Sequence, residues 1–299
     1  MPLAVRRAGC FVALIAAWVC AVSTANAQGG ATGDDLFDDS VVHEIRSDRL
    51  GRAYDLYVRT PPEYASEANA LRRYPVIYIN DAHYTFQTGA GVTLSPMRHG
   101  GLEPAILVAI SYAEGEGGAD SRGRDLTPVP NPDRPDKSGG ARAYLTFIKD
   151  EVIPFVEATY RTDPARRTLT GQSYGGLFGA FALFEEPGLF ADYILTSASL
   201  WYGEGVMFDI EAEFARTHRA LPARVYFAIG ETETPSSNSG RYDMVGDQKR
   251  FADQLRSRNY DGLTVRDEVV EGGTHLTTFP IGLLRGLMWQ LPGSNPYGG

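Results

Sequence analysis

The stretch from Arg167 to Gly176, RTLTGQSYGG, contains the pattern Gly-x-Ser-x-Gly with Ser173 at its centre. A short β-prone run leads into the pattern, and the apolar run Leu177–Phe184 follows it. This order is typical of a strand that turns sharply into a helix and exposes a nucleophilic serine at the turn. Glycines two residues before and after the serine leave room for its strained backbone. The alternative is a glycine-rich turn with a capping serine.

A serine nucleophile needs a base, and in enzymes with this turn the order along the chain is serine, acid, histidine. Two of the five histidines, His218 and His275, follow Ser173. His218 lies in a charged stretch that resembles a solvated helix. His275 follows Gly272-Gly273 after the last predicted strand, so it should lie at the same sheet edge as Ser173. We therefore predict that His275 is the base.

The acid should follow the strand that neighbours the serine turn. Arg224–Ile229 is that predicted strand, and Glu231 and Glu233 come directly after it. A carboxylate at this place would hold the His275 imidazole in its working tautomer. Spacing alone does not choose between the two glutamates, and both could instead be solvated.

Two backbone amides are candidate donors to the oxyanion that forms during ester cleavage. The Tyr174 N–H should lie at the N-terminus of the helix after Ser173, where amides point at developing negative charge. The second donor normally comes from the loop after the third strand. That loop is Asn80–Tyr84, and we predict the His83 N–H as the donor.

The rest of the chain predicts an α/β fold with a mostly parallel central sheet flanked by helices. Two strand-like segments come first, and strands then alternate with helices. Near-continuous apolar runs such as VIYI, AILVAI and VYFAI suit strands buried on both faces. The predicted strands are Val41–Arg46, Ala53–Val58, Val76–Asn80, Ala105–Tyr112, Arg167–Thr170, Tyr193–Ser197, Arg224–Ile229 and Leu263–Val270. The predicted helices are Tyr144–Val156 with a kink at Pro154, Leu177–Phe184, Asp247–Arg258 and Phe279–Leu291. Residues 113–140 should form a long polar loop, and residues 203–219 a small helical lid.

The N-terminal residues predict a secretory signal peptide, residues 1–27. Arg6 and Arg7 precede an apolar stretch of 13 residues, and Ala25-Asn26-Ala27 then gives a cleavage site. Residues 28–40 should be a flexible leader, and residues 41–299 a single domain. Both cysteines lie within the signal peptide, so the mature protein should lack thiol chemistry. We expect a periplasmic or secreted protein without stable membrane insertion, since no apolar run reaches 18 residues.

The charge and the motifs also narrow the range of partners. A formal net charge of −9 argues against nucleic acid, whose phosphates require a basic surface. No His-Glu-x-x-His motif or His/Asp cluster suggests a metal, so we expect no metal and no cofactor. Oligomeric state cannot be read from the sequence.

Several of these segments together resemble one branch of the α/β-hydrolase superfamily. The branch contains siderophore esterases of the enterobactin and salmochelin type, S-formylglutathione hydrolase (esterase D), feruloyl esterases and mycolyltransferases. The matching segments are Tyr74–Asp81 (YPVIYIND), Arg124–Pro128 (RDLTP), Phe147–Pro154, Gly171–Gly176 (GQSYGG), Ser197–Trp201 (SASLW), Gly230–Glu233 (GETE) and Gly272–His275 (GGTH). They occur in the family order over nearly all of the mature chain.

The resemblance implies Ser173 as nucleophile, His275 as base and Glu233, rather than Glu231, as acid. Some siderophore esterases are described as using a Ser/His dyad, which is the alternative to an acid. The family's Asp-Gly after the third strand corresponds to Asp81-Ala82 in this chain.

We expect Trp201 and Tyr84 to bind substrate, and Arg122 and Arg124 to receive an anionic group. Core packing of the aromatic side chains is one alternative, and local ion pairs of these arginines with acids such as Asp120 or Asp125 are the other.

The resulting prediction is a serine hydrolase that cleaves small carboxylic esters through an acyl-enzyme on Ser173. Siderophore esters and aryl esters are candidate substrates. The alternatives are an acyltransferase that uses the same acyl-enzyme, and a non-catalytic protein of this fold that binds a siderophore or lipid.

Overall fold

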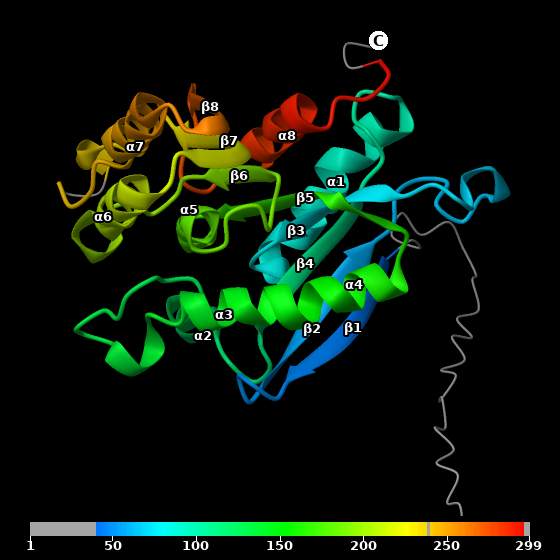
Figure 1. Ribbon diagram of the computed structural model, residues 1–299, viewed down its shortest axis with the longest axis horizontal. Coiled ribbons are helices and arrows are strands. Elements are labelled where there is room, and N and C mark those ends of the chain that lie inside the picture. Colours follow the sequence, from blue (N-terminus) through cyan, green and yellow to red (C-terminus); the bar gives the residue numbers. More distant parts are fainter. Residues whose placement is uncertain (1–39, 238–239, 296–299) are drawn as a thin grey trace, which may run out of the picture. The chain divides into compact units, whose positions relative to one another are not determined.

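The computed structural model describes residues 40–237 and 240–295. The predicted signal peptide and residues 28–39 of the predicted leader lie outside the described residues. Ser40, assigned to the leader, is the first residue of a strand. The described strands form one eight-stranded sheet in the order β1-β2-β4-β3-β5-β6-β7-β8 (Figure 1).

All eight predicted strands are present. They are β1 (Ser40–Ser47), β2 (Arg52–Arg59), β3 (Tyr74–Ile79), β4 (Ile106–Ala113), β5 (Thr162–Gln172), β6 (Asp192–Thr196), β7 (Ala220–Gly230) and β8 (Asp261–Val270). The pairs β1–β2 and β2–β4 are antiparallel, and every other pair is parallel. The mostly parallel α/β sheet predicted from the apolar runs is therefore confirmed.

Helices cover both faces of this sheet (Figure 1). They are α1 (Ala82–Arg98), α2 (Gly118–Asp125), α3 (Ala141–Phe147), α4 (Ile153–Thr159), α5 (Tyr174–Glu185), α6 (Tyr202–Thr217), α7 (Met244–Arg258) and α8 (Thr278–Gln290). Along β3, Val76 and Tyr78 join the core under α3 to α7, whereas Ile77 and Ile79 join the core under α1 and α8. This alternation explains why the strand has an uninterrupted apolar sequence.

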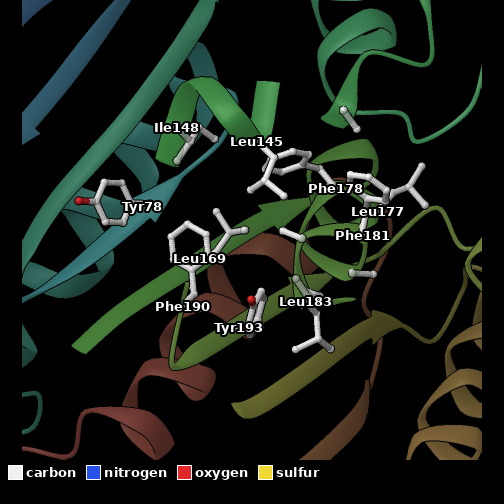
Figure 2. Close-up of a cluster of buried hydrophobic side chains, with 14 of the residues drawn as sticks. Tyr78, Leu145, Ile148, Leu169, Leu177, Phe178, Phe181, Leu183, Phe190 and Tyr193 are labelled. Atoms are coloured by element: carbon white, nitrogen blue, oxygen red, sulfur yellow. The ribbon is translucent and has the colours of Figure 1, made fainter. Parts of the chain in front are cut away.

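The helix that follows Ser173 is anchored in the larger core. Figure 2 shows its side chains Leu177, Phe178, Phe181 and Leu183 among residues of β3, β5, β6 and α3. Each is at most 4% exposed. Since burial of one such side chain contributes about 1.5–3 kcal/mol, α5 is firmly fixed against the sheet.

Two helices differ from the sequence-based expectation. α1 was not predicted, because its buried positions include Gly89, Ala90 and Thr93, which hide the apolar periodicity. α2 lies within the segment predicted as a polar loop, and its buried residues are Ser121, Gly123 and Asp125. Small or polar residues form part of the inner face of both helices, so their apolar pattern is harder to recognise in the sequence.

The predicted kink at Pro154 takes the form of a π-helical turn, Ile148–Val152, between α3 and α4. The wider turn comes just before Pro154, which sits in the first turn of α4. A proline there needs no intrahelical N–H bond, so the chain continues in a helical course.

The sharp turn at Ser173 depends on close backbone packing of two glycines. A Cβ added at Gly171 would collide with the backbone carbonyl of Gly175, whereas a Cβ at Gly91 in α1 would meet nothing within 4 Å. We expect Gly171→Ala to lower the free energy of unfolding by about 1–3 kcal/mol. Gly91→Ala should leave it unchanged or raise it by up to about 1 kcal/mol. Urea denaturation of both variants measures the difference, and equal effects would contradict the packing argument.

Candidate active site

Ser173 occupies a strained turn between β5 and α5. Its φ and ψ are 59° and −117°, a combination that non-glycine residues rarely adopt. The turn is held by the Ser173 N–H, which donates to the Thr196 carbonyl at 3.0 Å, and by the Leu177 N–H, which donates to the Ser173 carbonyl at 2.9 Å. Gly175 faces the β3 side of the turn, where an added Cβ would lie 3.3 Å from Asp81 Oδ2. The glycine therefore lets the end of β3 approach the serine.

His275 is held by a buried glutamate. Its Nδ1 lies 2.6 Å from Glu233 Oε2, and Glu233 is 4% exposed. The second carboxylate oxygen, Oε1, accepts hydrogen bonds from Ser197 Oγ at 2.7 Å and from the Gly230 N–H at 2.8 Å. Burial alone would raise the pKa of Glu233, but these hydrogen bonds outweigh it and lower the pKa below its usual value. The carboxylate is therefore ionised and fixed, and it can stabilise an imidazolium.

Glu231 has a different partner from Glu233. Its Oε2 accepts a hydrogen bond from the Gly272 N–H at 2.9 Å, so its side chain braces the turn that precedes His275. The geometry thus favours Glu233 for contact with the imidazole, in line with the implication of the family resemblance.

A hydrogen bond links the backbone of His275 to the residue before Ser173. The Gln172 side-chain amide donates to the His275 carbonyl, and Gln172 directly precedes Ser173. Within the described residues, the Ser173 hydroxyl bonds to Ser199 Oγ at 3.3 Å rather than to the imidazole. The His275 Nε2 atom has no hydrogen-bond partner in that part of the chain, so it can accept a proton. Hydrogen bonds of this kind often form only once a substrate is bound.

The other histidine that follows Ser173 in the chain, His218, lies elsewhere. It is exposed at the end of α6, where its ring stacks on Phe214 with a centroid distance of 3.9 Å. It therefore acts as the solvated helical residue that its sequence context predicts.

Two helices begin beside Ser173. Tyr174 is the first residue of α5, and the segment predicted as a loop at Asn80–Tyr84 enters α1 at Ala82. The first N–H groups of a helix have no acceptor within that helix, so the amides of Tyr174 and His83 are both available to a ligand. In the turn between β3 and α1, Asp81 has a positive φ of 65°, and Ala82 has helical geometry. The His83 ring stacks on Tyr112 with a centroid distance of 4.3 Å, so its side chain has a packing role.

Arg122, which with Arg124 was expected to receive an anionic group, instead supports this turn through an ion pair. Arg122 Nε donates to Asp81 Oδ1 at 2.8 Å, and the Tyr84 hydroxyl donates to Oδ2 at 3.0 Å. Asp81 is 3% exposed, and burial raises the pKa of its carboxyl although Arg122 opposes that shift. Arg122 also donates to the Gln172 carbonyl at 3.4 Å, so it links α2 to both turns beside Ser173. The tight pairing of Asp81 with a distant arginine has no signature in sequence.

Arg124, the other arginine that we predicted as an anion receptor, is already paired. Its Nε donates to Asp125 Oδ1 at 2.8 Å and its guanidinium also reaches Glu116. Its side chain is 14% exposed. The structure therefore favours the local ion pair that was the alternative for this residue.

A cleft of about 1000 Å³ opens beside the serine turn. Its lining comes from three segments: Val129–Pro132, the stretch from Trp201 to Asp209, and residues of 241–254. Trp201 stacks on Tyr242 with a centroid distance of 3.8 Å, and it contacts the ring of Tyr174, the residue after Ser173. Ser173 and His275 do not themselves line this cleft, and Trp201 connects it to the residue after the serine. The cleft is large enough for a sizeable ligand.

Tyr84 does not belong to this lining and instead contacts Phe279 and Asp81. The predicted lid corresponds to α6. Residues Gly203, Glu204 and Gly205 have positive φ, so the regular helix starts after them. Phe208 of α6 lines the cleft and Met207 is fully buried in the core.

The described residues contain neither a metal-binding cluster nor a membrane-spanning helix. No group of three or more His, Cys, Asp or Glu side chains in residues 40–237 and 240–295 could hold a metal ion. In the same residues, no helix combines the length and hydropathy needed to cross a bilayer.

Together with the sheet, this geometry defines an α/β-hydrolase-fold enzyme of the serine hydrolase class. A model of the family described as "Putative esterase" matches residues 47–289, and the chain belongs to that family. The resemblance found in the sequence is thereby confirmed, and the protein is a carboxylic ester hydrolase.

Named relatives share most of the chain. Ferri-bacillibactin esterase BesA of Bacillus subtilis is 26% identical over 92% of this chain and 97% of the relative. The siderophore triacetylfusarinine C esterase of Aspergillus fumigatus is 32% identical over 71% of this chain and 75% of the relative. Among solved structures, siderophore hydrolase EstB from Aspergillus nidulans is similar with a TM-score of 0.75 and 26% identity, over 88% of this chain and 98% of that chain.

The two glutamates after β7 provide a matched test of the site. Glu233→Gln removes the charge beside the imidazole, so we expect kcat for a p-nitrophenyl ester to fall by about 10⁴-fold. Glu231→Gln keeps an amide oxygen that can accept from the Gly272 N–H, so its kcat should fall far less. Steady-state kinetics of both variants on the same ester measures the two losses in kcat. Equal losses, or the reverse order, would exclude Glu233 as the acid.

Proposed function

We propose that this protein hydrolyses siderophore esters through an acyl-enzyme on Ser173. His275 Nε2 takes the hydroxyl proton as Ser173 Oγ attacks the ester carbonyl. The amides of Tyr174 and His83 stabilise the negative oxygen of the tetrahedral intermediate. His275 then protonates the leaving alcohol, and a water molecule that it activates releases the acid.

One observation carries this proposal. The ionised Glu233 holds His275 Nδ1 at 2.6 Å, on a histidine whose carbonyl is bonded to the residue before Ser173. A carboxylate on Nδ1 fixes the tautomer in which Nε2 is the basic atom, and it stabilises the imidazolium that forms. A protein that only bound its ligand would have no need of this arrangement.

The choice of siderophore esters rests on two supports. First, the names of similar proteins refer to siderophores: ferri-bacillibactin esterase, triacetylfusarinine C esterase and siderophore hydrolase. The cleft beside Ser173 is bordered by Trp201, Tyr202 and Tyr242, whose flat faces suit aromatic or extended acyl groups. Its volume of about 1000 Å³ also exceeds the needs of a simple acyl ester.

We further propose that the protein acts outside the cytoplasm. Arg6-Arg7, the apolar stretch Cys10–Val22 and the Ala25-Asn26-Ala27 site support export through a cleaved signal peptide. Mass spectrometry of the protein from its natural source tests this, and a mature N-terminus at Gln28 is the expected result.

The nucleophile is tested by covalent labelling. A fluorophosphonate probe reacts with an activated serine, so the wild-type protein should be labelled at Ser173 and Ser173→Ala should not be labelled. The same pair should differ on a catecholate trilactone and on p-nitrophenyl esters of increasing chain length, with kcat lowered on the order of 10⁴–10⁶-fold in the variant. Binding of the trilactone without turnover by the wild-type protein would instead favour a non-catalytic binder.

The cleft is tested by comparing a large and a small substrate. Trp201→Ala removes one aromatic wall, so kcat/KM for the catecholate trilactone should fall by about 3- to 10-fold. Hydrolysis of p-nitrophenyl acetate, whose acyl group is far smaller than the cleft, should stay within about twofold of the wild type. An equal loss on both esters would mean that Trp201 supports the fold of the site rather than the substrate.

A further inference from the structure

Ser199 is a second serine at the nucleophile. It lies in the segment Ser197-Ala198-Ser199, which follows β6, and it is 1% exposed. Its Oγ is 3.3 Å from Ser173 Oγ, and its N–H donates to the Ser173 carbonyl at 3.2 Å. Both the side chain and the main chain of Ser199 therefore contact the nucleophilic residue.

The burial of Ser199 determines which hydroxyl donates. A buried O–H group is unfavourable unless its proton has an acceptor. In the described residues, Ser173 Oγ is the hydrogen-bond partner of Ser199 Oγ, and bulk water hardly reaches Ser199. Ser199 thus has its acceptor in Ser173 Oγ. The proton of Ser173 is then directed away from Ser199, where His275 Nε2 can take it.

The segment that carries Ser199 is held on both sides. The Ser197 N–H donates to the Ala228 carbonyl at 2.7 Å, and the Tyr202 N–H donates to the Ser199 carbonyl at 3.0 Å. Ser197 has a φ of 44°, an unusual value for a serine, and its hydroxyl donates to Glu233. Ser197 thus contacts the acid that holds His275, and Ser199 contacts the nucleophile, so Ser199 has little freedom to turn away.

We propose that Ser199 is a further catalytic residue, whose hydroxyl donates a hydrogen bond to Ser173 Oγ during attack. This inference rests on the proposed function. Where transfer of the Ser173 proton to His275 Nε2 runs ahead of bond formation to the acyl carbon, Oγ carries partial negative charge in the transition state, before that charge passes to the carbonyl oxygen. A hydrogen bond to a charged oxygen is stronger than one to a neutral hydroxyl, so Ser199 stabilises the transition state more than the resting state. Ser199 keeps its own proton throughout the step.

The test is the rate at which a fluorophosphonate inactivates the enzyme. Ser199→Ala should lower the second-order rate constant on the order of 10- to 100-fold, with a similar fall in kcat and little change in KM. The pH profile of kcat/KM should keep its inflection and lose only plateau height, because the His275–Glu233 pair is untouched. An unchanged inflection would show that the variant has lost only the hydrogen-bond donor and that His275 and Glu233 keep their positions.

Two further variants distinguish a hydrogen-bonding role of Ser199 from a packing role. Ser199→Cys fills nearly the same space with a weak donor, so it should react as slowly as Ser199→Ala. If Ser199 only packed, the cysteine variant would react at the wild-type rate, and the proposal would be overturned. Ser47→Ala is the matched control, because Ser47 is also buried but bonds Glu151 and the Leu50 N–H instead. It should lower the melting temperature without slowing inactivation.

The two proposals fail in different ways. If the wild-type protein does not react with the probe, the serine hydrolase mechanism on Ser173 is wrong. If the wild type reacts and Ser199→Ala stays within twofold of it, the mechanism stands and only the role of Ser199 is rejected. A loss in Ser199→Ala accompanied by a shifted pH inflection would also reject the role of Ser199.

Discussion

The strained backbone at Ser173 is the constraint on which the rest of the site depends. A φ of 59° in a serine is held only because the chain on either side is fixed, by β5 before the turn and by the buried helix α5 after it. Gly171 and Gly175 make the turn possible, since a side chain at Gly171 would strike the Gly175 backbone. The apolar core under α5 thus stabilises a conformation that the local sequence alone would not adopt.

Parallel strand order then gathers the polar groups around this serine. Ser173 follows β5, Ser199 follows β6, Glu233 follows β7 and His275 follows β8, and these four strands are parallel neighbours in the sheet. Residues 102 positions apart in the chain are thereby brought to one edge. The buried carboxylate of Glu233 is tolerated there because Ser197, the Gly230 amide and His275 all donate to it. Those same bonds keep it ionised, which is the state that the imidazole requires.

Much of this arrangement could be predicted from the sequence. The strands were found because burial on both faces leaves uninterrupted apolar runs, and Ser173 because the steric demand of its turn selects glycine at two fixed positions. The chain order of the serine and histidine then limited the base to two candidates. By contrast, the inner faces of α1 and α2 include glycine, threonine and serine, so the apolar periodicity that predicts helices is weak. Arg122 and Ser199 act through contacts with residues far away in sequence, and no local pattern encodes those contacts.

The walls of the cleft come from other segments of the chain than the residues around Ser173. Its walls come from the segment after α2, the start of α6 and the start of α7, none of which contributes a group to the Ser173–His275–Glu233 arrangement. The positive φ values at Gly203, Glu204 and Gly205 redirect the chain so that Trp201 can stack on Tyr242. Sequence changes in these walls would alter which esters bind while leaving the buried carboxylate and the serine turn intact. If substrates bind in this cleft, as we propose, its shape and charge rather than the chemistry of bond cleavage decide which ester is used.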